Sequence, residues 1–327
     1  MVDACDFLSI EKPVLQGAMG AVARHDLVVA VSKAGGLGTL SYLPPENFRR
    51  ELARIEDSLE GRSFAANLLM PIISKAHVEA CLQSDVPIVS IFYGFSKRLV
   101  SALKDAGKKV LFQVGSVDEA KLVVAEGADG VIVQGHEAGG HLRGTERLAV
   151  LLPKVREALP NHLVVGAGGI HDETSAARCR SFGADAVCSG TRFLASPESA
   201  AHPAYKQRLI SDSSTIVTRL FGVGWRDPHR VMPNAATGKW LRGDGSEPAW
   251  LPALHSLTRI LSKLAGGDGG AALTARQALS RPLYTPSCLT VEMNEALLEV
   301  VALYAGECVG EVRELQGAAK TVARLST

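Results

Sequence analysis

Residues 109–135 read KVLFQVGSVDEAKLVVAEGADGVIVQG, and this stretch contains one complete strand–helix–strand unit. Its two ends are apolar runs, Lys109–Val114 and Gly130–Gly135, which have the length and composition of strands buried on both faces. Between them, Ser116 with a glutamate three residues later forms the capping-box pattern of a helix start, and Gly127 marks the helix end. This order predicts two parallel strands joined by a helical crossover.

The same unit repeats through the first 190 residues. The pentapeptide GADGV at 127–131 recurs as GADAV at 183–187, and amphipathic helical segments separate the apolar runs. The candidate strands are Pro13–Gly17, Gly36–Ser41, Phe64–Met70, Pro87–Tyr93, Lys109–Val114, Gly130–Gly135, Leu163–Ala167 and Asp185–Gly190. Eight parallel strands with alternating helices predict an α/β fold, the closed (β/α)8 TIM barrel.

The alternation stops after the eighth strand. Residues 200–287 are rich in Pro, Gly and Trp, and two apolar helical stretches follow at Val291–Tyr304 and Val309–Leu325. We expect residues 1–199 and 288–327 to form the barrel and residues 200–287 to form a mostly helical insertion on the substrate side. A separate C-terminal helical domain is the alternative, and the absence of a long linker-like stretch argues against it.

Composition limits the class of protein. The chain has 327 residues, 46% of them hydrophobic, and a net charge of +1, so it shows no electrostatic preference for nucleic acid or an anionic membrane. The first ten residues lack the basic start of a signal peptide, and no apolar run reaches membrane-spanning length. The six cysteines are scattered without a C-x-x-C pair, which disfavours zinc and disulfides. We therefore expect a cytoplasmic protein.

A chemically distinctive segment follows the sixth strand. Residues 134–144 read QGHEAGGHLRG, with His136, Glu137 and His141 around a glycine pair. Glycine allows the backbone to approach a flat or anionic ligand closely, and an imidazole can move a proton near neutral pH. The alternative is a glycine-rich turn with a solvated histidine. The glycine and amide residues at the other strand ends favour a ligand site over this alternative.

The loops after the seventh and eighth strands both contain glycine. They read GAGGI at 166–170 and SGTRF at 189–193, and each ends a strand and begins a helix. In TIM barrels these two loops commonly form a phosphate site from backbone N–H groups. Uncharged amides also occur in or at the ends of apolar strands, at Gln16, Asn67, Gln113 and Gln134. Amides on one rim suit the edge of a heteroaromatic ring.

These residues together resemble the nitronate monooxygenase family, FMN-dependent barrel proteins that also include flavin enoyl-acyl-carrier-protein reductases and NADH:quinone reductases. The resemblance spans nearly the whole chain. It rests on the segments 16–19, 32–38, 67–68, 137–141, 167–170, 190–193, 202–206 and 304–306. Two features point to different branches: Gln16-Gly17 with Ala18 is closer to the enoyl reductases, and residues 222–230 are closer to the monooxygenases.

The resemblance implies a set of site residues and an FMN cofactor. It assigns the FMN phosphate to Gly168, Gly169, Gly190 and Thr191. It places along the flavin the residues Gln16, Gly17, Met19, Asn67 and Gly139, with Gln113 and Gln134 in support. It implies that His141 faces the substrate above the ring as the catalytic residue. For Glu137 we expect a supporting role, orienting either the loop or the His141 ring. No metal is expected.

The leading hypothesis is oxidation of a small nitroalkane or its nitronate anion, with dioxygen as the second substrate. The His141 imidazole would take the α-proton of a neutral nitroalkane or, as imidazolium, pair with the nitro oxygens. The alternative enzyme is an NAD(P)H-dependent flavin reductase of an enoyl thioester or a quinone. A non-enzymatic FMN carrier is the third possibility. The sequence does not fix the oligomeric state, and a homodimer is left open.

Overall fold

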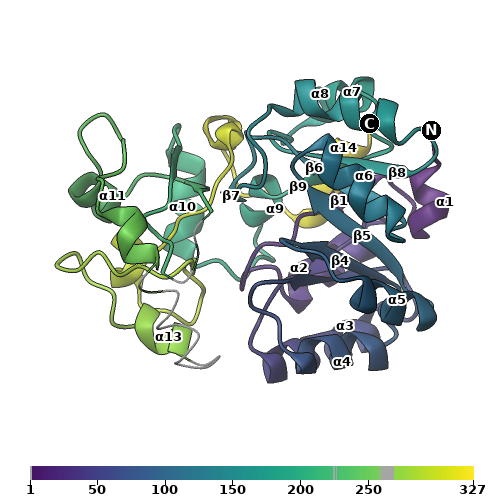
Figure 1. Cartoon of the computed structure of the whole chain (residues 1–327), viewed down its shortest axis with the longest axis horizontal. Helices are drawn as coiled ribbons and strands as arrows, with labels where there is room; N and C mark the ends of the chain where they lie inside the picture. Colours follow the sequence, from purple (N-terminus) through teal and green to yellow (C-terminus); the bar gives the residue numbers. More distant parts are fainter. Residues whose placement is uncertain (1, 224, 226, 257, 259–268) are drawn as a thin grey trace.

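A computed structural model of the chain describes residues 2–223, 225, 227–256, 258 and 269–327, and Figure 1 shows its arrangement. The barrel lies on one side, coloured purple to teal, and a green-to-yellow segment lies on the other. Part of the expected insertion, residues 259–268 with most of the glycine-rich run 266–270, falls outside the described residues.

Eight parallel strands form the barrel sheet, in the order β1-β9-β8-β6-β5-β4-β3-β2. Their bounds are β1 (Val14–Gln16), β2 (Thr39–Leu40), β3 (Ala65–Leu69), β4 (Ile88–Phe92), β5 (Lys109–Val114), β6 (Gly130–Gln134), β8 (Leu163–Ala167) and β9 (Ala186–Ser189). Every candidate strand of the sequence is found; most keep their bounds to within one residue, and Gly36–Ser41 is reduced to the two residues of β2. The prediction of a TIM barrel is confirmed.

Helices alternate with these strands and cover the outside of the barrel. They are α2 (His25–Lys33), α3 (Pro45–Leu59), α4 (Lys75–Gln83), α5 (Lys97–Asp105), α6 (Val117–Ala125), α7 (Leu148–Ala158), α8 (Glu173–Ser181), α9 (Thr191–Leu194) and α14 (Ala318–Ser326). Their apolar faces and the outward strand residues form one core, in which Phe48, Leu103 and Val155 are fully buried. Burial on both faces explains why the strands are almost continuously apolar.

The barrel interior is a second, separate core. Leu15, Leu111 and Val165 point inward from different strands, and α1 (Ala4–Leu8) adds Leu8 to the same cluster. The side chain of Lys109, at the start of β5, donates to the Phe7 carbonyl oxygen. The first helix therefore closes the end of the barrel where the strands begin, which leaves the opposite end for a site.

The barrel closes along a short seam between the strands β1 and β2. Only an isolated bridge joins Leu15 to Leu37 there, supported by hydrogen bonds of Gln16 N to Leu37 O and of Leu37 N to Val14 O, each 2.9 Å. The Gln16 side chain adds to this seam, because its Oε1 accepts from Thr39 N at 2.9 Å.

The segment after the barrel differs from the expected mostly helical insertion. Its described residues contain α10 (Pro203–Ser211), α11 (Ala235–Trp240), α13 (Gly269–Thr274), a helical stretch at residues 251–256, and the strands β10 (Ile216–Thr218) and β11 (His229–Val231). These two strands form an antiparallel sheet with β7 (Gly140–His141), which belongs to the loop after β6. The strands are too short to give a pattern in the sequence.

The two expected C-terminal helices are also corrected. Residues 291–304 contain only the 3-10 turn η1 (Glu295–Glu299), and residues 309–325 are helical only in α14 and at the end of η2 (Glu307–Glu311). Val301 and Leu303 pack into one cluster, whereas Val300 and Ala302 pack into another. This alternation belongs to an extended segment buried on both sides, and periodicity alone does not distinguish such a run from a buried helix.

The segment after residue 288 packs against both parts of the chain. Leu289 and Val309 share a cluster with Tyr205 and Leu209 of α10 and with barrel residues such as Leu194, and α14 packs with the barrel helices through Val322. The division into a barrel of residues 1–199 and 288–327 and an insertion of residues 200–287 stays a proposal.

Candidate active site

A cavity of about 1700 Å³ lies at the carboxyl ends of the barrel strands, between the barrel and the inserted segment. It is lined by eleven of the twelve residues assigned to the site from the sequence: Gly17, Met19, Asn67, Gln113, Gln134, Gly139, His141, Gly168, Gly169, Gly190 and Thr191. The fold thus brings together residues spread over the first 191 positions. Their individual roles remain proposals.

The loops after β8 and β9 form one floor of this cavity. Gly168 has φ +124° and Gly169 has φ +70°. Residues other than glycine adopt this backbone conformation only with strain. The Ser189 hydroxyl donates to Ile170 O at 2.7 Å and so ties the two loops together. At Gly190 a Cβ would meet only Met19 Sδ at 3.9 Å, so this glycine leaves open space.

Gln16 is the one assigned residue that does not line the cavity. Its side chain is 1% exposed, and both ends of the amide are used within the barrel: Nε2 donates to Gly17 O and Oε1 accepts from Thr39 N. A buried amide needs such partners. The arrangement favours a role for Gln16 in closing the barrel seam over contact with a cofactor.

The other three amide side chains, Asn67, Gln113 and Gln134, line the cavity, and Gln134 also supports the loop after β6. Asn67 Nδ2 donates to Ser90 Oγ at 2.9 Å, across the β3–β4 pair. Gln134 holds the loop that follows its own strand: Nε2 donates to His141 O at 2.8 Å, and Oε1 accepts from Arg143 N at 2.9 Å. Gln134 therefore fixes the backbone on which His141 is carried. Gln113 lines the cavity from the end of β5.

Glu137 also supports this loop. Both of its carboxylate oxygens accept from Leu148 N, at 3.2 and 3.0 Å, at the N-terminus of α7. A carboxylate is favourable at a helix N-terminus, where N–H groups lack partners. At Gly139 a Cβ would lie 2.5 Å from the carbonyl carbon of Ala305, so the C-terminal segment passes directly against the loop.

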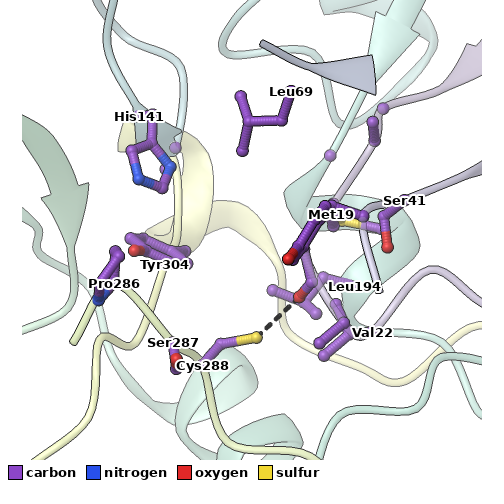
Figure 2. Close-up of a pocket in the computed structure, with 18 of the residues that line it drawn as sticks. Met19, Val22, Ser41, Leu69, His141, Leu194, Pro286, Ser287, Cys288 and Tyr304 are labelled. Atoms are coloured by element: carbon purple, nitrogen blue, oxygen red, sulfur yellow. Dashed lines mark hydrogen bonds between the residues drawn. The ribbon is translucent and has the colours of Figure 1, made fainter. Parts of the chain in front are cut away.

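His141 stands on β7 at the edge of the cavity, as Figure 2 shows. Its ring is surrounded by aromatic side chains, with centroid distances of 4.4 Å to Trp225, 5.0 Å to His229 and 5.4 Å to Tyr304. Burial among these rings lowers the pKa of His141 to about 4. The imidazole is therefore neutral near pH 7, which disfavours the expected alternative of an imidazolium paired with nitro oxygens.

The two ring nitrogens of His141 differ. Nε2 is buried and has no hydrogen-bond partner among the described residues. The residue as a whole keeps some exposed surface, which belongs to the cavity wall. A buried nitrogen without a partner is unusual in proteins and calls for a physical explanation.

Several residues of this environment were not found from the sequence. Tyr93, with φ +57°, donates its hydroxyl hydrogen to Leu142 O at 2.6 Å and packs against Trp225 at a centroid distance of 4.8 Å. Trp225 and His229 come from the inserted segment; they lie in the stretch 222–230 that the resemblance singled out, but neither received a role. Tyr304 lay inside a motif of the resemblance but received no role.

Another part of the cavity wall comes from residues 286–288. Figure 2 shows Pro286, Ser287 and Cys288 below His141 and Tyr304. The thiol of Cys288 donates to Gly20 O at 2.9 Å, and burial raises its pKa to about 12. This cysteine is therefore a protonated structural contact between the barrel loop after β1 and the segment at residues 286–288.

The residues fit a flavin at this position. Two glycines with positive φ and one with open space at Cβ leave a cavity floor without side chains, and the cavity is larger than common small-ligand pockets of about 300–1000 Å³. No cluster of three or more His, Cys, Asp or Glu side chains suitable for a metal occurs within the described part of the chain. Fold and site define a TIM barrel with a cavity that suits a flavin.

Comparison with known proteins identifies its family. The model of the nitronate monooxygenase family matches residues 3–80 and 65–279, and the chain belongs to that family. A relative from Mycobacterium tuberculosis, (3aS,4S,5R,7aS)-5-hydroxy-7a-methyl-1-oxo-octahydro-1H-indene-4-carboxyl-CoA dehydrogenase, is 33% identical over 69% of this chain. The match spans 64% of that relative's length.

Two solved structures are similar over almost the full chain. A nitroalkane oxidase from Streptomyces ansochromogenes has a TM-score of 0.76 and 29% identity, and the match covers 99% of this chain and 96% of that one. FabK from Thermotoga maritima has a TM-score of 0.75 and 28% identity, with coverage of 99% and 94%. Within the described residues, no helix is long and apolar enough to cross a membrane.

Proposed function

We propose that this protein uses FMN to oxidise a small nitroalkane or its nitronate anion, with dioxygen as the second substrate. The observation that carries the proposal is the neutral His141 imidazole at the edge of a glycine-floored cavity in a nitronate monooxygenase family member. The similarity to a nitroalkane oxidase supports the same substrate class. When bound, the flavin would accept electrons from the substrate, and dioxygen would restore its oxidised form.

The choice of FMN over FAD rests on the shape of the phosphate site. Gly168, Gly169, Gly190 and Thr191 offer two short loops that suit one phosphate group. The first strand is followed by QGAMGAV, which lacks the G-x-G-x-x-G pattern of dinucleotide sites. We therefore assign FMN, with Met19 and Asn67 along the ring.

The protein's own contribution to the reaction is proton transfer at His141. Because Nε2 is buried, we assign Nδ1 as the nitrogen that accepts the α-proton of a neutral nitroalkane. The C–H electron pair stays on the substrate, which becomes the nitronate anion. Trp225 and Tyr304 exclude water from the ring and hold its orientation. A preformed nitronate has already lost this proton and does not need the base.

A second candidate is an NAD(P)H-dependent reductase of an enoyl thioester or a quinone. The observation that favours it is the cavity volume of about 1700 Å³, which exceeds what FMN and a nitroalkane with few carbon atoms require. The relative named as a carboxyl-CoA dehydrogenase points to the same substrate class.

We also propose a cytoplasmic location, because all six cysteines are free thiols, as a reducing compartment would keep them.

Replacement of His141 tests the proposal. We expect His141→Ala to retain FMN, because the imidazole lies away from the phosphate loops, and to lose roughly two to four decades in turnover of a neutral nitroalkane. Turnover of preformed nitronate should fall much less. Steady-state oxygen consumption with both substrates gives the two ratios.

The control is His136→Ala, which removes the other imidazole of the same loop. His136 does not line the cavity, and its Nδ1 lies 3.4 Å from Gly144 O, so both activities should be close to wild type. Equal losses on the two substrates in His141→Ala would contradict the role of a base, and an unchanged variant would remove His141 from the reaction.

A further inference from the structure

Behind His141 lies a group of buried polar atoms that the proposed reaction does not use. His141 Nε2, both ring nitrogens of His229 and the Tyr304 hydroxyl oxygen are buried without a hydrogen-bond partner among the described residues. The three rings are neighbours, with centroid distances of 5.0 Å for His141–His229 and 5.9 Å for His229–Tyr304. Four buried polar atoms without partners in one place indicate that small rotations of these side chains would join them in a hydrogen-bond network.

The backbone sets His141 and His229 against each other. They are direct partners in the β7–β11 register, so their side chains leave the small sheet on the same face. Their rings meet at 81°. A hydrogen bond between two imidazole nitrogens of about 2.9 Å places the ring centres roughly 5 Å apart, which is the separation found. A modest rotation of either ring therefore joins them.

We propose that His229 is a positioning residue for His141: its ring accepts the Nε2 hydrogen of His141 and thereby keeps Nδ1 bare for the substrate proton. In a neutral imidazole only one nitrogen carries hydrogen, and the partner of one nitrogen decides the state of the other. His229 is 0% exposed and does not line the cavity, so it acts through His141 and not on the substrate. The catalytic consequence rests on the proposed function.

Tyr304 is a less suitable partner. A phenol readily donates its hydrogen, and donation to His141 Nε2 would put the ring hydrogen on Nδ1, where it blocks the base. Burial is the largest cause that lowers the pKa of His229. The charges of His141 on β7, His255 from the helical stretch at 251–256 and Arg219 after β10 lower it further, and the Phe221 backbone acts in the opposite direction as the smallest cause. His229 therefore stays neutral and able to accept.

The proton balance is simple. The substrate Cα–H bond breaks, its electron pair stays on the substrate as the nitronate, and the proton forms a bond to His141 Nδ1. The resulting imidazolium keeps its Nε2 hydrogen, which His229 holds in a now charge-assisted hydrogen bond. No proton passes to His229, and no further reactant is needed.

The experiment compares His229→Leu, which has no acceptor, with His229→Gln, whose side-chain oxygen can accept the same hydrogen. We expect kcat for neutral nitroalkane to fall roughly tenfold to a hundredfold in His229→Leu with little change in KM, and turnover of nitronate to stay near wild type. His229→Gln should recover most of the loss. His25→Asn, an imidazole on the outer helix α2, serves as the matched control.

A second readout does not depend on activity. In 15N-histidine-labelled protein, the His141 signal is assigned by its absence in His141→Gln, and its chemical shifts report which nitrogen carries hydrogen. We expect the Nε2–H form in wild type and His229→Gln, and a shift toward Nδ1–H in His229→Leu. Should His229→Leu fail to fold, His229→Phe keeps a ring without an acceptor and takes its place.

The possible outcomes distinguish the pairing of His141 with His229 from the proposed reaction. An unchanged His141 tautomer in the acceptor-free variant, or equal behaviour of His229→Leu and His229→Gln, would overturn the positioning role. If wild type oxidised neither nitroalkane nor nitronate, the proposed function would fail, and the tautomer measurement would still decide whether His229 sets the state of His141.

Discussion

The chemical state of His141 depends on side chains that are distant from it in the sequence. The motif around it predicted an imidazole at the rim, and His141 does line the cavity. The motif could not predict that Trp225, His229 and Tyr304 close around the ring. Those neighbours decide that the imidazole is neutral, because burial penalises its charged form.

This burial predicts a pH dependence of stability. The folded-state pKa of His141 is about 4, below the ordinary value of 6.5, so between these values the unfolded chain binds more protons and stability falls as pH falls. Above about pH 6.5 the contribution is constant. The difference in unfolding free energy between pH 7.5 and pH 5 should be larger in wild type than in His141→Gln, by about 2 kcal/mol.

Urea unfolding of flavin-free protein at the two pH values measures this difference. The buried His229 titrates in the same direction in both proteins; because the His141 charge also lowers the pKa of His229, the difference includes this coupling between the two imidazoles. Equal pH dependence in wild type and His141→Gln would mean that the imidazole is solvated in solution.

At the scale of single elements, the barrel strands could be predicted from the sequence because they are buried on both faces. Lys109–Val114 and Leu163–Ala167 have the same bounds in the structure as in the prediction. Prediction failed where the segments are short or extended: β7 has two residues, and Val300 to Leu303 alternate between two clusters. Nothing local in those stretches specifies which distant surface they meet.

The loops after β8 and β9 allow a test of the phosphate site. Gly169→Asp and Gly190→Asp each place a carboxylate where the proposal puts the FMN phosphate, and like charges repel. We expect both purified variants to lose the cofactor, as measured by the ratio of flavin to protein absorbance. Gly190→Asp is free of backbone strain, since Gly190 has φ −104° and open space at Cβ.

Gly107→Asp is the control for the strain at Gly169. Gly107 has φ +75°, similar to +70° at Gly169, but lies before β5 at the other end of the barrel and has nothing near its Cβ. It should keep wild-type occupancy. If Gly169→Asp and Gly190→Asp retained the cofactor as well, the phosphate would have to bind elsewhere.

At the scale of the whole molecule, the small sheet β10-β11-β7 joins the inserted segment to the barrel loop that carries His141. The barrel thus supplies the cavity floor, and the insertion supplies part of the surroundings of the His141 imidazole. The sequence predicted the first part through its glycine loops and apolar strands. It could not predict the second, because the β7–β11 pairing joins residues about 90 positions apart.

We propose that the bound flavin takes electrons from a nitronate. This is tested by the flavin absorbance of the purified protein under anaerobic conditions after addition of a nitronate and, in separate samples, of NADH and NADPH. We expect the nitronate to bleach the flavin and the nicotinamides to do so far more slowly. Bleaching by NADH or NADPH with no response to nitronate would contradict it and would establish the reductase alternative on the same fold.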